Sequence, residues 1–319
     1  MEFIICVHKA RGGLKAESRL RRDEQLILGG LQGSSAGGRN TSPPEADKMG
    51  LARLWRVLKP LLRPNDRVNR LMLIFDFDGV LINSINEVTL TVYNATTGKL
   101  VTDLAALPTA LVRLFQGNRF HVQPIGDAIL LMNWCLDNYH SAAEKILSRQ
   151  EFGSIISETK TDVSQRTDAI YSMRKRFIDQ AHDTWMALHQ PYQPIWTELL
   201  RCQKRPFVIL TNKNRDATLR LCRRFGLDLK ETDIYAGDHG VTKVENMKQI
   251  QERCRSDIYY FIDDSVKNLQ ELDAHLDSAR RNLVLLFASW GYTGPEDPGI
   301  ARAAGYAVYR QTDLISLLV

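Results

Sequence analysis

Two aspartates stand one residue apart, directly after an apolar run. The stretch "LMLIFDFDGVLINS" spans residues 71–84 and places Asp76 and Asp78 after five residues typical of a strand buried on both faces. Two like charges beside a dry core are costly unless a cation or a proton compensates them. The pattern allows two interpretations: an Asp-Gly turn with an aspartate capping a helix, or a pair of carboxylates that does chemistry.

Other polar residues follow later apolar runs. "PFVILT" ends in Thr211 and is followed by Asn212, and "IYYFID" leads into Asp263 and Asp264. Lys243 begins a predicted helix between these two runs. The carboxyl ends of parallel strands meet at one edge of a sheet, where open α/β sheets bind their ligands.

The chemistry of such an edge depends on which side chains gather there. Asp76, Asp78 and Asp264 would form a set of oxygen ligands suited to Mg²⁺. A hydroxyl, a backbone N–H and a lysine at the other strand ends would hold the oxygens of a phosphate. Taken singly, each of these residues has an ordinary structural interpretation, as a strand residue, a helix start or an N-cap. Their joint occurrence at strand ends favours a site.

The elements that must position these residues alternate in type. Apolar runs at 206–211, 233–237, 258–263 and 282–288 are separated by helical patterns at 214–225, 243–255 and 266–277. This alternation predicts a parallel sheet covered by helices. Residues 85–200 contain helical patterns and almost no strand-like run, so the sequence predicts an α/β core interrupted by an all-helical insertion. The expected division is an extension at 1–67, a core at 68–84 and 201–319, and an insertion at 85–200.

The net charge of +5 is unevenly distributed. Residues 1–70 hold 14 Lys and Arg against 7 Asp and Glu, a net charge of +7, so the other 249 residues carry −2. The body of the protein is therefore near neutral, and we expect no nucleic-acid partner. No window approaches 18 uninterrupted apolar residues, and the first residues make a poor secretory signal.

The N-terminal segment shows two further patterns. Residues 29–47 are rich in Gly, Ser and Pro and predict a disordered linker. Residues 49–64 predict a basic amphipathic helix that packs on its own domain or touches a membrane surface or a partner. Met49 is a candidate for an alternative start of translation. The five cysteines are scattered and never spaced as CxxC, which indicates reduced thiols in a cytoplasmic protein without a zinc site.

Four motifs resemble a known family in their order and spacing. "DFDGVLINS", "VILTNK", Lys243 and "YFIDDS" resemble the four motifs of the haloacid dehalogenase superfamily. "TNKNRDATLRLCRRFGL" and the "WGY" at 290–292 look like its phosphoglycolate phosphatase group. The resemblance covers residues 70 to about 310. It implies a Rossmann-like core with a type 1 helical cap that closes over the substrate.

The resemblance implies a role for each aspartate of the first motif. Asp76 would attack phosphorus and form an aspartyl phosphate, and Asp78 would protonate the leaving oxygen and then deprotonate water. The dehalogenases of this superfamily lack an acidic residue at the position that matches Asp78. The presence of Asp78 therefore favours phosphate ester chemistry. The implied function is Mg²⁺-dependent hydrolysis of a small phosphorylated metabolite. Two alternatives stay open: a phosphomutase that uses the same residues, and a non-catalytic binding module on this scaffold.

The remaining motif residues would bind metal and phosphate. Mg²⁺ would be held by the Asp76 side chain, the Asp78 carbonyl and Asp264, with Asp263 in a supporting position. Thr211 and the Asn212 backbone N–H would bind phosphate oxygens, and Lys243 would neutralise charge on the transferred group. The chain departs from the family pattern at Asn268, where other members carry a further aspartate.

Overall fold

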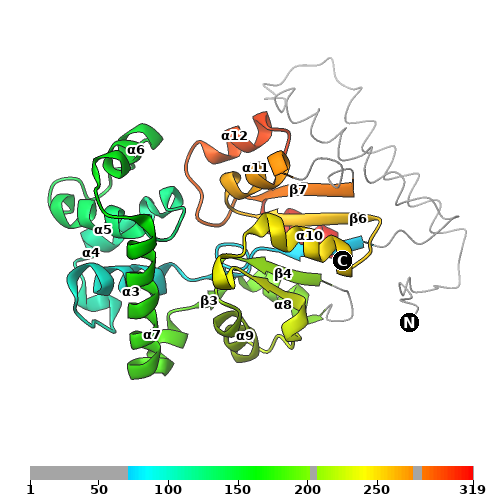
Figure 1. Ribbon diagram of the computed structural model, residues 1–319, viewed down its shortest axis with the longest axis horizontal. Coiled ribbons are helices and arrows are strands. Elements are labelled where there is room, and N and C mark those ends of the chain that lie inside the picture. The colour runs from blue at the N-terminus through cyan, green and yellow to red at the C-terminus, as the bar shows by residue number, and fades with distance from the viewer. Residues whose placement is uncertain (1–70, 202–206, 276–281, 319) are drawn as a thin grey trace, which may run out of the picture. The chain divides into compact units, whose positions relative to one another are not determined.

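The computed structural model describes residues 71–201, 207–275 and 282–318 (Figure 1). Six strands form one parallel sheet in the order β5-β4-β1-β6-β7-β8. Their bounds are Leu71–Phe75 (β1), Phe207–Thr211 (β4), Ile234–Ala236 (β5), Ile258–Asp263 (β6), Leu283–Ala288 (β7) and Ala307–Tyr309 (β8). The predicted α/β class with a Rossmann-like parallel sheet is confirmed. The expectations for residues 1–67 lie outside the described residues.

The central strands are apolar because helices cover the sheet. The buried side chains of Met72, Ile74 and Phe261 form one core with Met247 and Leu269 from the covering helices. The helices that follow the strands are α9 (Arg215–Arg224), α10 (Lys243–Arg253), α11 (Val266–His275), α12 (Asp297–Ala303) and α13 (Gln311–Leu318). Because all six strands run parallel to their neighbours, their carboxyl ends lie at one edge of the sheet.

The insertion after β1 is helical, as predicted. Its α-helices are α3 (Ile85–Thr97), α4 (Thr109–Gly117), α5 (Asp127–Asn138), α6 (Arg149–Glu158) and α7 (Val163–Ala187). They share a separate core in which Val92, Phe115, Leu131 and Ile170 are buried. This insertion is called the cap below.

Two connections join the cap to the sheet. Strand β2 (Ile82–Asn83) pairs in antiparallel fashion with β3 (Gln190–Pro191), so the chain leaves for the cap and returns from it side by side. Helix α8 (Gln193–Arg201) follows β3 and packs on α13 of the core. The indole of Trp196 in α8 donates a hydrogen bond to the Phe225 carbonyl at 3.0 Å. Helix α8 therefore packs with the core, although the sequence-based division placed residues 193–200 in the cap.

Candidate active site

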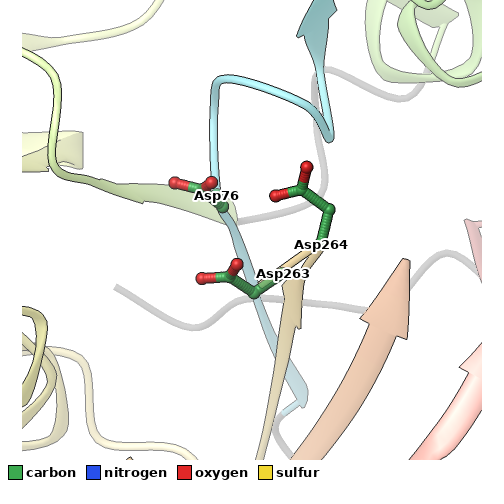
Figure 2. Close-up of side chains that lie close together, drawn as sticks. All are labelled: Asp76, Asp263 and Asp264. Atoms are coloured by element: carbon green, nitrogen blue, oxygen red, sulfur yellow. The ribbon is translucent and has the colours of Figure 1, made fainter. Parts of the chain in front are cut away.

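Three carboxylates meet where β1 and β6 end (Figure 2). Asp76 directly follows β1, Asp263 ends β6 and Asp264 follows it. One oxygen atom from each lies within 4.8 Å of the others, and all three side chains are buried. The register that pairs Phe75 with Ile262 brings these strand ends together. The structure thus places Asp76, Asp263 and Asp264 in one cluster.

Lys243 supplies the cationic side chain of this cluster. Its Nζ lies 2.9 Å from Oδ1 of Asp76 and 2.6 Å from Oδ2 of Asp263. The lysine is positioned by the start of α10, where Thr242 and Glu245 form a capping box that fixes the helix N-terminus. Burial would lower the pKa of Lys243, but Asp263 and Asp76 outweigh burial and raise it, so the ammonium stays charged.

The three carboxylates hold more negative charge than one ammonium can balance. Burial, reinforced by the charge of Asp263, raises the pKa of Asp76 to about 7 despite the opposing effect of Lys243. Burial and the charges of Asp263 and Asp76 raise the pKa of Asp264 well above its usual range. These shifts arise because buried like charges without enough counter-charge favour protonation. A divalent cation would remove this imbalance.

The residues present fit a magnesium ion. Asp263 is already engaged: besides Lys243, its carboxylate accepts hydrogen bonds from the Ser265 backbone at 2.8 Å and from the Asn268 amide. Among the described residues, only the backbone N–H of Tyr292 donates a hydrogen bond to the Asp264 carboxylate, at 2.6 Å. Hard carboxylate oxygens are the ligands that Mg²⁺ prefers. Asp76 and Asp264 therefore fit the role of metal ligands, and Asp263 fits that of their support.

Two glycines leave room for the Asp264 carboxylate. A Cβ on Gly79, whose φ is +89°, would lie 2.0 Å from Oδ2 of Asp264. A Cβ on Gly291 would lie 2.3 Å from the same oxygen atom and 2.4 Å from the Gly79 carbonyl. Real Cβ atoms do not approach other atoms this closely, so both positions require glycine.

Asp78 lies in a different electrostatic environment. Its carboxylate accepts hydrogen bonds from Lys213 Nζ, at 3.1 and 3.3 Å, and from the Ser84 hydroxyl. Burial would raise the pKa of Asp78, but Lys213, Ser84 and His189 outweigh it and hold the pKa below its usual range. The pKa values of the neighbouring Asp76 and Asp78 are thus shifted in opposite directions, because Lys213 and Ser84 stabilise the charge of Asp78.

Two of the three phosphate-binding residues predicted from sequence, Thr211 and Asn212, lie at the end of β4. Thr211 is buried, and its hydroxyl accepts the backbone N–H of Lys213 at 3.0 Å. Asn212 is exposed. Lys213 was not among the site residues predicted from sequence, although it is buried and ion-paired with Asp78. Its position directly after a strand with the site residues Thr211 and Asn212 was the signal that could have identified it.

A second charged group lies buried in the cap. Glu87 in α3 is fully buried and pairs with Arg174 in α7, with Nε at 2.7 Å and a second nitrogen at 3.1 Å. Its Oε1 also accepts the Trp185 indole N–H at 3.1 Å and the Thr91 hydroxyl at 2.8 Å. Burial opposes ionisation, but Arg174 and further cations outweigh it and hold the pKa of Glu87 well below its usual range.

Arg119 is a half-buried cation of the cap. Its guanidinium lies 5.4 Å from the ring centroid of Tyr292, and it donates to the Val122 carbonyl at 3.0 Å. Its Nε is buried without a hydrogen-bond partner, and it forms no ion pair with a described residue. Burial lowers the pKa of Arg119, while Tyr292, Asp264 and Asp78 act in the opposite direction. A buried N–H donor without a partner is costly, so the Nε of Arg119 suits a bound anion.

A cavity of about 340 Å³ lies beside Tyr292, between cap and core residues. Its lining includes Asn83, Gln116, Phe120, Tyr192, Trp290 and Tyr292. The indole N–H of Trp290 is bonded to the Val80 carbonyl at 3.1 Å, so its polar atom is satisfied within the protein. The Tyr192 hydroxyl has no such bond to a described residue, and burial together with Asp264 and Asp78 raises the pKa of Tyr192. The cavity thus offers aromatic walls and a free hydroxyl close to the aspartates.

Comparisons with known proteins give structural neighbours only. No family model matches the chain, and no curated protein matches its sequence. A haloacid dehalogenase-like family hydrolase from Streptococcus pneumoniae is 13% identical, with a TM-score of 0.46 over 78% of this chain and 98% of that one. A predicted phosphoglycolate phosphatase from Haemophilus somnus is 15% identical, with a TM-score of 0.47 over 78% and 97%.

A third neighbour is a predicted phosphatase from Clostridium acetobutylicum, 15% identical, with a TM-score of 0.46 over 78% of this chain and 98% of that one. None of the helices in the described part of the chain combines the length and apolar character of a membrane span.

Proposed function

We propose that the protein is a Mg²⁺-dependent phosphatase of the haloacid dehalogenase type that hydrolyses a small phosphorylated metabolite. The observation that carries this proposal is that the aspartates of one site lie in two different electrostatic environments. Asp76 and Asp264 lie in a cluster with excess negative charge, while Asp78 beside them is held by Lys213. A metal-assisted nucleophile next to a separate proton donor and acceptor is the minimum that two-step phosphoryl transfer needs.

In the first step, a carboxylate oxygen of Asp76 attacks phosphorus and the bond to the leaving oxygen breaks. The proton for the leaving oxygen comes from Asp78. Lys213 favours the ionised form of Asp78, so the acid form must be restored when substrate binds. A phosphate dianion would do this by attracting the same ammonium and by repelling the carboxylate.

In the second step, the ionised Asp78 takes a proton from water, and the resulting hydroxide attacks phosphorus. The bond between phosphorus and Asp76 breaks, and inorganic phosphate leaves. Lys213 and Ser84 hold Asp78 in the base form that this step requires. A phosphomutase would use the same groups but exclude water, so phosphate release separates the two alternatives.

The transferred group needs positive charge around it. Mg²⁺ bound by Asp76, Asp264 and the Asp78 carbonyl would screen the repulsion between the nucleophile and the phosphate. Thr211, the Asn212 backbone N–H and Lys243 would bind the phosphate oxygens, with Asp263 keeping Lys243 in place at 2.6 Å.

The rest of the substrate would lie toward the cap. The cavity beside Tyr292 and the guanidinium of Arg119 favour a leaving group with an apolar or planar part and an anionic substituent.

We also propose a cytoplasmic location for the protein. The free thiols at Cys135, Cys222 and Cys254 agree with this location.

The experiment that tests the function is hydrolysis of a panel of phosphorylated metabolites with Mg²⁺, measured as inorganic phosphate released. Turnover that vanishes in Asp76→Asn would support the proposal. A panel with no released phosphate, and no transfer to a second hydroxyl, would leave only a binding role for this scaffold.

A further inference from the structure

Gln123 in the cap uses both ends of its amide to contact the core. The residue lies between the last turn of residues 119–121 and α5, and its Nε2 donates to Oδ1 of Asn268 in α11. Its Oε1 accepts the hydroxyl of Ser265 at 2.8 Å, and its backbone carbonyl accepts Lys267 Nζ at 3.3 Å. A primary amide that donates at one end and accepts at the other has one orientation in this site.

Asn268 is the partner that connects Gln123 to the aspartates. Its Nδ2 donates to both oxygen atoms of Asp263, at 3.2 and 2.9 Å, so its Oδ1 must face the cap. Asn268 is buried, and its backbone N–H is bonded to the Ser265 hydroxyl at 3.3 Å. An aspartate at this position would set two carboxylates against each other, whereas asparagine donates to Asp263 and accepts from the cap.

From Asp263 the contacts continue to the proposed nucleophile. Asp263 accepts Lys243 Nζ at 2.6 Å, and the same ammonium lies 2.9 Å from Oδ1 of Asp76. An unbroken series of polar contacts therefore runs from Gln123 through Asn268, Asp263 and Lys243 to Asp76. Every side chain in it beyond Gln123 is buried, where hydrogen bonds strengthen one another.

We propose that Gln123 is a positioning residue that couples the seated cap to the orientation of Lys243 and Asp76. The proposal rests on the proposed function, because it assigns a reaction role to the same aspartates. When the cap is seated, the Gln123 amide donates to Asn268 and so supports its bond to Asp263, which holds the lysine. When the cap is open, Asn268 loses its second partner and Lys243 is held less firmly. Chemistry is thereby favoured only after the cap has closed on substrate.

The structure offers a matched control contact. Arg149 of the cap pairs with Asp297 of the core, whose other oxygen accepts the Gly294 N–H at 2.8 Å. This contact also joins cap to core, but it does not lead to the aspartates. Arg149→Gln therefore weakens only the attachment of the cap to the core. Gln123→Ala weakens this attachment and also interrupts the polar contacts that lead to Asp76.

The kinetic test compares Gln123→Ala, Gln123→Glu and Asn268→Ala with Arg149→Gln on the best substrate of the panel. We expect kcat to fall roughly tenfold in Gln123→Ala with little change in KM, since neutral hydrogen bonds are worth about this factor. Gln123→Glu keeps the bond to Ser265 but places a carboxylate oxygen opposite Oδ1 of Asn268, where two acceptors repel each other. Its kcat should therefore fall at least as much as that of Gln123→Ala. The variant with both Gln123→Ala and Asn268→Ala should lose no more than the worse single change, because the residues act in series. Equal losses in Arg149→Gln and Gln123→Ala, or full additivity, would overturn the proposal.

A second measurement does not need catalysis. Hydrogen exchange of the full chain should show faster exchange at residues 265–268 in Gln123→Ala, by about threefold or more, and no change there in Arg149→Gln. If the wild-type protein releases no phosphate from any ester, the proposed function fails while this measurement still decides the coupling. Unchanged exchange at residues 265–268 in Gln123→Ala would show that the contact with the cap does not stabilise the start of α11, and would overturn the proposal.

Discussion

The Nζ of Lys213 lies 3.1 Å from Oδ1 and 3.3 Å from Oδ2 of Asp78, so one buried ammonium spans both oxygen atoms of the carboxylate. This relationship keeps Asp78 ionised in a place where burial alone would favour its protonated form. Lys213 thus controls the residue that must alternate between acid and base.

The first prediction concerns Lys213→Met. Without the ammonium, burial should raise the pKa of Asp78, so the base form needed for the second step disappears at a higher pH than in wild type. The acidic limb of the kcat profile should therefore move to higher pH, with a loss of roughly tenfold or more near pH 5.5 and a smaller loss at neutral pH. Lys213→Arg keeps the charge and serves as the control. A profile of Lys213→Met that superimposes on wild type would show that the pair does not set this ionisation.

The second prediction concerns the buried pair of Glu87 and Arg174. Glu87→Gln leaves the Arg174 guanidinium without its counter-ion and should destabilise the protein by about 3–5 kcal/mol in urea unfolding at pH 7. Because the folded-state pKa of Glu87 is lowered, the stabilisation is present above the unfolded carboxyl pKa of about 4.3 and is lost as pH falls below it. The difference between wild type and variant should shrink as pH decreases from about 5 toward 3.

Lys175 provides the control for this prediction in the same helix. It pairs with Asp179 at 2.5 Å, but both side chains are exposed. Lys175→Ala should change the free energy of unfolding by less than about 0.5 kcal/mol. A Glu87→Gln variant as stable as Lys175→Ala would mean that the buried pair adds no net stability.

Much of the sheet could be predicted because burial leaves a continuous apolar signal. The runs at 71–75 and 258–263 coincide with β1 and β6, and the run at 282–288 differs from β7 by one residue. Two features were missed. Strand β8 has only three residues, and the β2–β3 ribbon pairs two residues with two others more than 100 positions away. These strands are too short to produce a recognisable alternation of apolar and polar residues in the sequence.

The site was predictable where each residue follows a strand, and less so where contacts cross the chain. Asp76 and Asp264 lie close together, as their positions after neighbouring strands predict, but the third carboxylate of the cluster is Asp263, whereas the predicted set contained Asp78. Glu87 lies in the first turn of α3, where an acidic residue is an ordinary feature of a helix start. Its partner Arg174 lies 87 positions later, so nothing in the sequence connects them. Interactions of this kind depend on how the cap folds and have no local pattern.

The third prediction concerns the metal. Excess chelator should reduce turnover to background, and Mg²⁺ should restore it, because the buried carboxylates carry negative charge that one ammonium cannot balance. Calcium should restore little, since its longer and more numerous bonds do not suit an octahedral phosphate site. Phosphate release with each cation added back to the chelated protein measures this. Full turnover in chelator would contradict a metal-assisted reaction.

The fourth prediction concerns Gly291→Ala. The new Cβ would lie 2.3 Å from Oδ2 of Asp264 and 2.4 Å from the Gly79 carbonyl, so the Asp264 carboxylate must shift from its position in the cluster. We expect the Mg²⁺ concentration for half-maximal activity to rise at least tenfold, with the fold retained. Gly98→Ala is the control, because nothing lies within 4 Å of its Cβ and only backbone strain of about 1 kcal/mol is expected. An unchanged magnesium dependence in Gly291→Ala would argue against Asp264 as a ligand.

The last prediction separates the two aspartates of the first motif. Asp76→Asn preserves the size of the side chain but leaves a poor nucleophile, so no phosphoenzyme should form and turnover should vanish. Asp78→Asn keeps Asp76 and removes proton transfer, which is typically worth about 10²–10⁴-fold. With an activated aryl phosphate, whose leaving group needs little protonation, the first step of Asp78→Asn should be affected less than with an alkyl phosphate.

The second step should remain slow in Asp78→Asn, because water has lost its base while Lys213 stays in place without a carboxylate to hold. A phosphorylated protein should therefore accumulate in this variant and not in Asp76→Asn. Asp76→Asn should stay folded, since it removes one charge from a crowded anionic cluster. Asp78→Asn leaves the buried Lys213 ammonium without its counter-ion, so this variant should be less stable than wild type. Mass spectrometry after mixing with aryl phosphate and Mg²⁺ measures the covalent adduct directly. A hydroxylamine-sensitive phosphate on Asp76→Asn, or wild-type turnover in that variant, would place the nucleophile elsewhere.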